Sequence, residues 1–292
     1  MSLLGPTIRQ FKAKNLTDWA AALTYYAVLS VFPALIVLVA LLGVLGHANT
    51  TNTLLHIVGQ IGPPSAIKTF KGPIDSVVKN KGGAGALLGV GLVGALWSAS
   101  GYIGAFMRAS NSVYDVGERR FLRKAPLQIG ITILMVLLLA VVLLAIVLTG
   151  PLATAVGSAF GVRSAIVTVW SIAKWPVLLV IVVTMISILY YLAPNVRQPG
   201  FHWVTPGGFL ALVVWILASA AFAVYVANFS SYNKTYGSLG AVIIFLLWIY
   251  ISNNALLLGL AFNAERERQR ELQEGLPAEK ELQLPPRDPS KS

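Results

Sequence analysis

The chain has 292 residues, of which 56% are hydrophobic and only 11% charged, and it contains no cysteine. A soluble domain is nearer 25% charged, so this composition excludes an ordinary soluble protein. The lack of cysteine excludes a disulfide framework, a thiolate nucleophile and a cysteine-based metal site. The net charge of +11 would suit nucleic-acid binding, but no aromatic-interleaved basic patch accompanies it, and we expect no nucleic-acid partner.

Six long apolar stretches fill most of the chain. Each has at least about 20 residues, enough for a helix to cross the roughly 30 Å hydrocarbon core of a bilayer. No water is present there to satisfy backbone groups, so each stretch must be helical. The sequence therefore predicts an all-α, polytopic membrane protein, a bundle of six transmembrane helices. The stretches are Ala20–Leu45, Gly85–Phe106, Pro126–Thr149, Ala165–Leu192, Trp203–Ala227 and Ser238–Phe262.

Three parts of the chain follow from this pattern. Residues 1–19 are predicted to be a cytoplasmic segment, either a short amphipathic helix on the membrane surface or a plain basic flank. Residues 20–264 form the six-helix transmembrane domain. Residues 265–292 form a polar cytoplasmic tail, predicted to continue the last span as a solvated or partner-docking helix to about Gly275 and to be disordered beyond it.

The distribution of positive charge predicts the orientation. With six spans, fifteen of the 22 Lys and Arg residues lie on the side of the termini and six on the other side, with Lys174 within the fourth stretch. The positive-inside rule then places both termini in the cytoplasm. Anionic lipid head groups are the expected partners of these charges.

The first span combines a proline with polar residues. Pro33 has no N–H and its ring clashes with the preceding turn, which predicts a kink near mid-membrane. Tyr26, Ser30 and Pro33 share one helical face, and Tyr25 is adjacent to it. This face either packs against another helix or lines a cavity.

The connection between spans one and two is the longest. Its apolar residues are broken by Gly62-Pro63-Pro64 and Gly72-Pro73, which predicts two short amphipathic helices on the outer membrane surface. A lid over an outward-facing cavity is the alternative. The basic residues expected to face lipid head groups are Lys68 and Lys71 here, and Arg119, Arg120 and Arg123 after span two.

Span two contains several pairs of small residues four positions apart, which let helices approach closely, so we expect it to be central in the bundle. Polar groups also occur in the later spans. Lys174, next to Pro176 in a span that can kink, is either an anchor that reaches the outer surface or a functional intramembrane cation. Asn253 and Asn254 either hydrogen-bond to another helix or belong to a substrate path. The candidate path residues are Tyr25, Tyr26, Ser30, Pro33, Trp97, Ser98, Ser100, Asn253 and Asn254.

Several segments together resemble one family, the YihY/virulence factor BrkB family of bacterial inner-membrane proteins, often labelled ribonuclease BN-like. The segments occur in family order. They are residues 21–33 (AALTYYAVLSVFP), 96–100 (LWSAS) with Met107, Asn111 and Tyr114 downstream, 189–197 (LYYLAPNVR), 232–242 (YNKTYGSLGAV) and 251–265 (ISN…NAE).

The resemblance implies six spans in the bacterial inner membrane with both termini inside. Some members of the family have been linked to envelope lipid export or serum resistance. This chain departs from the family pattern where Gly259 is followed by Leu260 and Ala261, because relatives often carry a glutamate there. The absence of that carboxylate argues against proton coupling at this position.

We expect a transporter or flippase of a lipid or lipid-linked envelope component. A non-transporting scaffold of envelope assembly, with an envelope protein as partner, and a small-solute transporter are the alternatives. We expect no catalytic residues, metal or cofactor, because His47, His56 and His202 are scattered and the spans hold no clear Asp or Glu.

Overall fold

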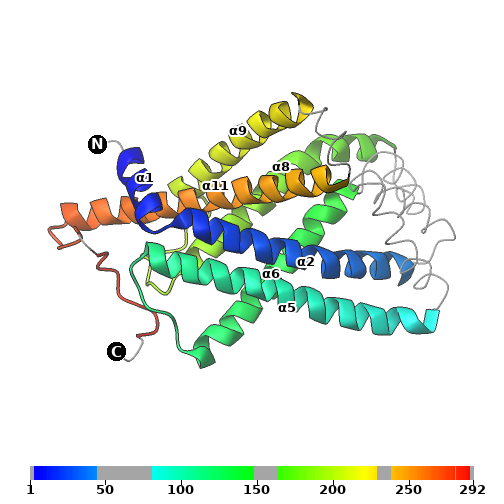
Figure 1. Cartoon of the computed structure of the whole chain (residues 1–292), viewed down its shortest axis with the longest axis horizontal. Coiled ribbons are helices and arrows are strands. Elements are labelled where there is room, and N and C mark those ends of the chain that lie inside the picture. The colour runs from blue at the N-terminus through cyan, green and yellow to red at the C-terminus, as the bar shows by residue number, and fades with distance from the viewer. Residues whose placement is uncertain (1–2, 45–80, 148–163, 229–237, 280, 290–292) are drawn as a thin grey trace. The chain divides into compact units, whose positions relative to one another are not determined.

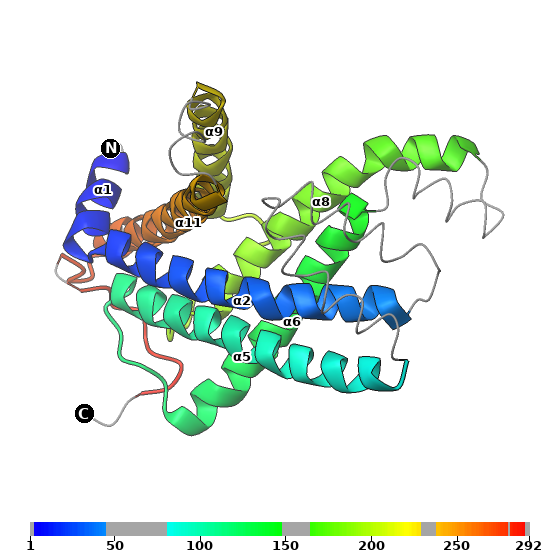
Figure 2. The same cartoon turned by 45° about the vertical axis from the view of Figure 1, so that its right-hand side comes forward.

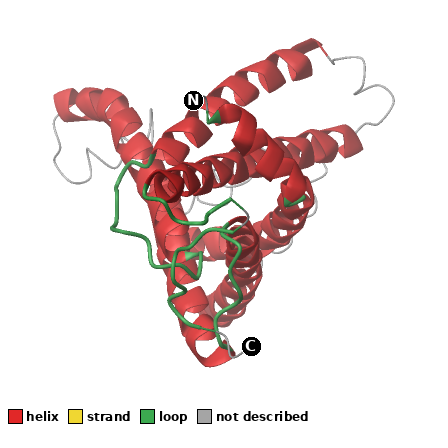
Figure 3. Cartoon of the chain, turned by 90° about the vertical axis from the view of Figure 1, so that its left-hand side faces the viewer, coloured by secondary structure: helices red, strands yellow, loops and turns green. Residues whose placement is uncertain are grey.

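The computed structural model describes residues 3–44, 81–147, 164–228, 238–279 and 281–289, and these residues form seven helices. No strand occurs among them (Figure 3), and a single antiparallel bridge joins Val196 to Pro286. The all-α prediction is therefore confirmed. The helices are α1 (Leu4–Ala13), α2 (Leu16–Val44), α5 (Lys81–Val113), α6 (Phe121–Val147), α8 (Ser164–Leu192), α9 (Pro206–Asn228) and α11 (Ser238–Gln273) (Figure 1).

Six of these helices coincide with the six predicted spans. Four contain a stretch that is long and apolar enough to cross a membrane, and these stretches are Phe121–Val142, Ile172–Leu192, Pro206–Ala227 and Val242–Gln273. The other two, α2 and α5, have 29 and 33 residues, but the structure does not describe all their side chains. The span count is thus confirmed for four helices. The amphipathic segment expected between spans one and two lies outside the described residues.

The chain divides into two compact units. Unit 1 consists of residues 1–10, 107–210 and 258–292, and unit 2 consists of residues 11–106 and 211–257. Each unit is described by itself below.

In unit 2, α2 and α5 lie side by side (Figures 1 and 2). Gly101 of α5 makes the approach close, because a Cβ atom at this position would lie 2.6 Å from Cδ1 of Tyr26 on α2. Small residues at helix–helix contacts allow this kind of packing in membranes. The predicted role of span two in close packing is seen at this glycine.

A buried polar network also joins the helices of unit 2. The Tyr102 hydroxyl donates to Oδ1 of Asn253 at 2.9 Å, and Nδ2 of Asn253 donates to Oγ1 of Thr24 at 3.1 Å. The Thr24 hydroxyl in turn donates to the carbonyl of Ala20 at 2.7 Å. The network links α5, α11 and α2, and each of its side chains has a partner, as buried polar groups require.

Substitution of Gly101 tests the approach of α2 and α5. Gly101→Ala should destabilise the protein by about 1–3 kcal/mol, because the new methyl group must displace the Tyr26 ring. Gly89→Ala in the same helix is the matched control, since its Cβ would meet nothing within 4 Å. Thermal unfolding in detergent measures both. Equal midpoints for the two variants would contradict the close approach.

In unit 1, α6 packs against α8. Helix α8 is bent (Figure 2), and Pro176 lies within it. A proline inside a helix removes one hydrogen bond and clashes with the preceding turn, which accounts for a bend.

Helix α11 ends in a glycine cap. Gly275 has a φ of +79°, the Gly275 N–H donates to the carbonyl of Leu272, and the Leu276 N–H donates to that of Glu271. These two bonds form a Schellman motif, which satisfies carbonyls at the helix end. The predicted end of the tail helix near Gly275 is therefore confirmed.

Candidate functional site: a groove in unit 1

The loop before α9 is fixed by a cap shared between two helices. Thr205 precedes α9, and its hydroxyl oxygen accepts the N–H of Gly208 at 3.0 Å, as an N-cap residue does. Oδ1 of Asn263 on α11 accepts the N–H of Gly207 at 2.8 Å, and Nδ2 of Asn263 donates to the Thr205 hydroxyl at 2.9 Å. Asn263 therefore joins the start of α9 to α11.

The end of the chain folds back onto the loops of unit 1. We call residues 281–289 the C-terminal strap. Asn195 holds it through both its backbone and its amide, because it accepts the N–H of Arg287 and the N–H of Asp288, each at 3.0 Å, and donates to the Asp288 carbonyl at 2.8 Å. The Arg287 guanidinium lies 4.5 Å from the centre of the Tyr191 ring. The structure differs here from the predicted disorder, since paired backbone groups hold the strap.

Asp288 is the most buried charged residue of the strap. Its carboxylate accepts the backbone N–H of Arg120 at 2.9 Å and forms an ion pair with Arg123 at 2.8 Å. A charge-assisted bond from a backbone N–H strengthens this attachment.

Arg119 caps the C-terminal end of α8. Its guanidinium donates to three consecutive carbonyl oxygens, those of Leu192, Ala193 and Pro194, at 3.0, 2.8 and 2.6 Å. A cation that binds the last carbonyls of a helix satisfies their hydrogen bonds. Its positive charge also interacts favourably with the negative end of the helix dipole. Burial lowers the pKa of Arg119 to about 10, and repulsion by the charge of Arg287 contributes to this decrease. The carboxylate of Asp288 acts in the opposite direction and raises the pKa. The side chain therefore stays charged at neutral pH.

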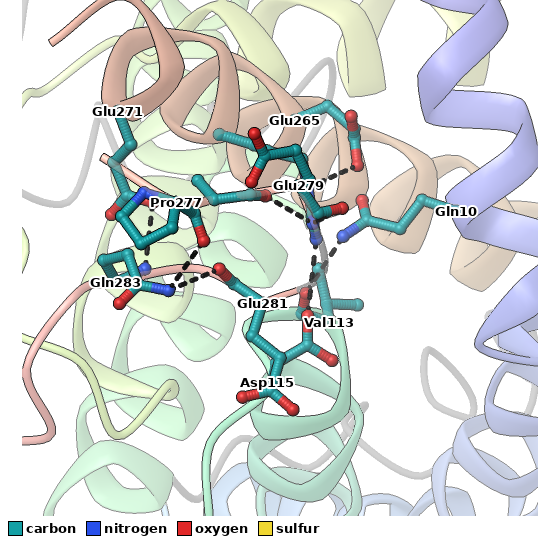
Figure 4. A network of polar contacts seen from close by, with 11 residues as sticks. Gln10, Val113, Asp115, Glu265, Glu271, Pro277, Glu279, Glu281 and Gln283 are labelled. Carbon is teal, nitrogen blue, oxygen red and sulfur yellow. Dashed lines mark hydrogen bonds and ion pairs between the residues drawn. The ribbon is translucent and has the colours of Figure 1, made fainter. Parts of the chain in front are cut away.

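A second polar network, which includes Asp115, Glu265 and Glu279, lies near the end of α11 (Figure 4). Arg268 forms ion pairs with Asp115 at 3.3 Å and Glu265 at 3.2 Å, and donates to the carbonyls of Ala278 and Glu279. Nearby, the buried Glu271 accepts the backbone N–H of Gln283 at 2.9 Å. These contacts cover one side of the helix that the sequence predicted to be solvated or partner-docking.

A groove with a volume of about 640 Å³ lies in unit 1, and we call it the terminal groove because Leu3 and Leu284, from the two ends of the chain, both line it. Its volume is within the range of about 300–1,000 Å³ of small-molecule sites. Its polar lining comes from one face of α11 and from the loop before α9. The lining residues are Leu3, Tyr114, Gln198, Pro199, Gly200, His202, Val204, Thr205, Pro206, Asn263, Arg266, Glu267, Gln269, Arg270, Gln273 and Leu284.

The charged groups of the groove are unequally paired. Arg270 forms ion pairs with Glu267 and Glu274. Arg266 is exposed, and the structure gives neither it nor His202 an ion pair or hydrogen bond with any described residue. Two arginines and one glutamate leave the lining with a positive excess.

Tyr114 adds a hydroxyl to the wall of the terminal groove. Burial raises the pKa of the Tyr114 hydroxyl above its ordinary value, and the charge of Glu267 raises it further. The hydroxyl is therefore protonated at neutral pH and available as a donor.

The predicted path residues of the first span differ in their surroundings. Tyr25 is 62% exposed, and its ring lies edge-on to Tyr26 at 5.5 Å between centroids. Tyr26 packs on Gly101, and the Ser30 hydroxyl donates to the Tyr26 carbonyl at 2.8 Å within its own helix. The side chain of Pro33 lies outside the described residues. Ser30 is thus satisfied without a partner on another helix.

The other predicted path residues also have different surroundings. Trp97 is 82% exposed, while Ser98 and Ser100 are half-buried. Asn253 belongs to the buried network of unit 2. This agrees with the prediction that it hydrogen-bonds to another helix. Nδ2 of Asn254 donates to the Tyr250 carbonyl one turn earlier at 2.8 Å.

The predicted head-group residues include one correction. Arg119 is only 6% exposed and donates to carbonyl oxygens, so it is a helix cap and cannot reach lipid head groups. Arg120 and Arg123 are exposed, and Arg123 is paired with Asp288. Lys68 and Lys71 lie outside the described residues.

Lys174 lies within α8, which begins at Ser164. Its ammonium lies 5.2 Å from the centre of the neighbouring, exposed Trp175 ring. The surface anchor and the intramembrane cation both remain predictions for this residue.

The sequence pattern did not predict a shared site for the basic residues of the terminal groove, although it predicted the membrane orientation and anionic lipid partners from them. Asn263, Arg266, Arg270 and Gln273 follow one another at intervals of three or four residues. That spacing puts them on one helical face and was the available signal for a shared site. The contribution of the distant Leu3 and Leu284 has no such local signal.

Comparison with known proteins gives the family. The family described as "Virulence factor BrkB" matches residues 7–283. The chain belongs to the BrkB family. It is therefore an integral membrane protein, in agreement with its apolar helices.

Two relatives illustrate the range of BrkB family names. A protein of Bacillus subtilis (strain 168) named ribonuclease-like protein YfkH is 31% identical over 93% of this chain and 98% of its own length. A UPF0761 membrane protein of Alkalilimnicola ehrlichii is 28% identical over 83% of this chain and 53% of its own length. No solved structure matches this chain significantly.

Proposed function

We propose that this BrkB family protein moves a lipid or lipid-linked envelope component across the bacterial inner membrane. The observation that supports this proposal is the mixed lining of the terminal groove. Arg266 and His202 supply polar groups, whereas Leu3, Val204 and Leu284 supply apolar walls. A path for an amphiphile needs both kinds of surface.

The proposal includes an orientation, in which the terminal groove opens to the cytoplasm. Leu3 and Leu284 line the same groove, so segments near both termini lie at one end of unit 1. The excess of Lys and Arg on the side of the termini supports a cytoplasmic location of this end. The groove would then meet the inner leaflet.

Exposed apolar residues beside the groove support access from the bilayer. Trp203, Val204 and Phe209 are exposed and lie at or just before the start of α9. Aromatic residues are enriched where membrane helices meet the interface. A bound amphiphile could keep its tails in lipid while its head group enters the groove.

Leaflet exchange in liposomes tests this function. Purified full-length protein should accelerate the movement of a fluorescent phospholipid between leaflets well above protein-free liposomes. Liposomes that contain an unrelated helical membrane protein at the same density control for leaks. Equal exchange rates in all three preparations, across several head groups, would contradict lipid movement. Stoichiometric crosslinking to one envelope protein would then favour the scaffold.

We also propose that the protein does not catalyse a reaction. The groove contains Glu267 in an ion pair with Arg270 and a single histidine, His202. Among the described residues, no three His, Asp or Glu side chains gather as a metal site. A ribonuclease assay of pure protein with added divalent metals tests this proposal, and RNA cleavage that follows the protein through purification would contradict it.

A further inference from the structure

We infer that the terminal groove selects an anionic, phosphate-bearing head group through Arg266, with His202 as a second contact. This inference rests on the proposed function and adds the chemical class of the ligand. The proposed movement of a lipid requires only an amphipathic surface, whereas selection requires a specific charged group.

Arg266 is the cation best placed for this role. It lines the groove, is exposed, and has no ion pair with any residue that the structure describes. Arg270, one turn further along α11, is held by Glu267 and Glu274. An anionic ligand would therefore meet one unneutralised guanidinium.

The Arg266 guanidinium suits a phosphate group. Its planar fork of N–H donors can bind two phosphate oxygens at once. His202 lines the same groove and can donate from a ring nitrogen. Neither residue has to break an existing bond with a described residue to bind the ligand.

The apolar lining distinguishes a lipid head group from free phosphate. Leu3, Val204 and Leu284 border the groove, and an inorganic ion would leave them against water. The exposed Trp203 and Phe209 lie beside the groove along the chain. The glycerol and upper chain carbons of an anionic phospholipid would cover this apolar surface.

Calorimetric titration of the detergent-solubilised full chain tests the site. The probes are short-chain phosphatidic acid, short-chain phosphatidylcholine and inorganic phosphate. Phosphatidic acid should bind at least about tenfold more tightly than either other probe, since only it joins net negative charge to an apolar part. Arg266→Gln should weaken phosphatidic acid binding about tenfold, the loss expected for a hydrogen bond to a charged group. His202→Gln should weaken it less.

Arg120→Gln is the matched control, because the Arg120 side chain is exposed and only its backbone N–H binds Asp288. Equal losses in Arg266→Gln and Arg120→Gln would show general attraction to a basic surface and overturn the site. Equal affinities for phosphate and phosphatidic acid would overturn the lipid head group as its ligand.

The leaflet-exchange assay separates this inference from the proposed function. If the wild type and Arg266→Gln exchange lipid at the same rate, the role of Arg266 is overturned and the transport proposal is kept. Selective binding without exchange would keep the site and overturn transport. Slower exchange of anionic lipid in Arg266→Gln, with phosphatidylcholine exchange unchanged, would support both.

Discussion

Gly207→Ala should destabilise the protein by about 3 kcal/mol, the upper end of the usual cost of an added methyl group in a packed site. A Cβ atom at position 207 would lie 2.0 Å from the carbonyl oxygen of Gly259 and 2.6 Å from Cγ of Asn263. The first contact is with backbone, so no side-chain rotation can relieve it. Helices α9 and α11 would have to separate, with loss of the Asn263 bond to the Gly207 N–H.

Thermal unfolding in detergent measures this effect, together with the yield of folded protein. Gly200→Ala is the matched control, because a Cβ there would meet nothing within 4 Å. Gly200 also lines the terminal groove, so the two substitutions probe the same region of unit 1. A Gly207→Ala protein as stable as Gly200→Ala would show that α9 and α11 do not approach closely at this point.

The hydrophobic pattern was sufficient to predict the helices. Six apolar runs led to six predicted spans, and the described helices lie at these positions because backbone groups in lipid must be satisfied within the helix. The stop near Gly275 was also readable, since glycine adopts the left-handed conformation of a helix cap without strain. Both features depend on local sequence alone.

The strap could not be predicted in the same way. Its residues are polar or proline-rich, which is typical of disorder, and they have no apolar period. Their order comes from partners far away in the sequence, such as Asn195 for Asp288. Arg119 was misassigned for the same reason, because a basic cluster after a span resembles a head-group site until its partners at the end of α8 are known.

The terminal groove was missed because its walls come from distant segments. The spacing of Arg266 and Arg270 places them on one face, but nothing local shows that Leu3 and Leu284 meet that face. The candidate substrate path stays a prediction. The structure adds that two of its polar residues, Ser30 and Asn254, each donate to a carbonyl one turn earlier.

Replacement of Arg119 by methionine should cost about 3–5 kcal/mol of stability. The substitution keeps much of the side-chain volume but removes the donors to three carbonyl oxygens at the end of α8. Each buried acceptor left without a partner costs about 1–3 kcal/mol. Arg119→Lys should fall between wild type and Arg119→Met, because a single ammonium keeps the charge but lacks the fork that reaches three carbonyls.

Arg120→Met is the control for this second prediction. The side chain of Arg120 is exposed, and its bond to Asp288 comes from the backbone N–H. A surface change of this kind usually alters stability by less than about 0.5 kcal/mol. Thermal unfolding gives the order of stability, and limited proteolysis of the strap gives an independent measure.

The carbonyls that Arg119 binds belong to residues 192–194, next to the Asn195 that holds Asp288. Loss of the cap should therefore also expose the strap to protease, whereas Arg120→Met should leave it protected. Equal stability and equal cleavage in both variants would contradict Arg119 as the residue that closes α8.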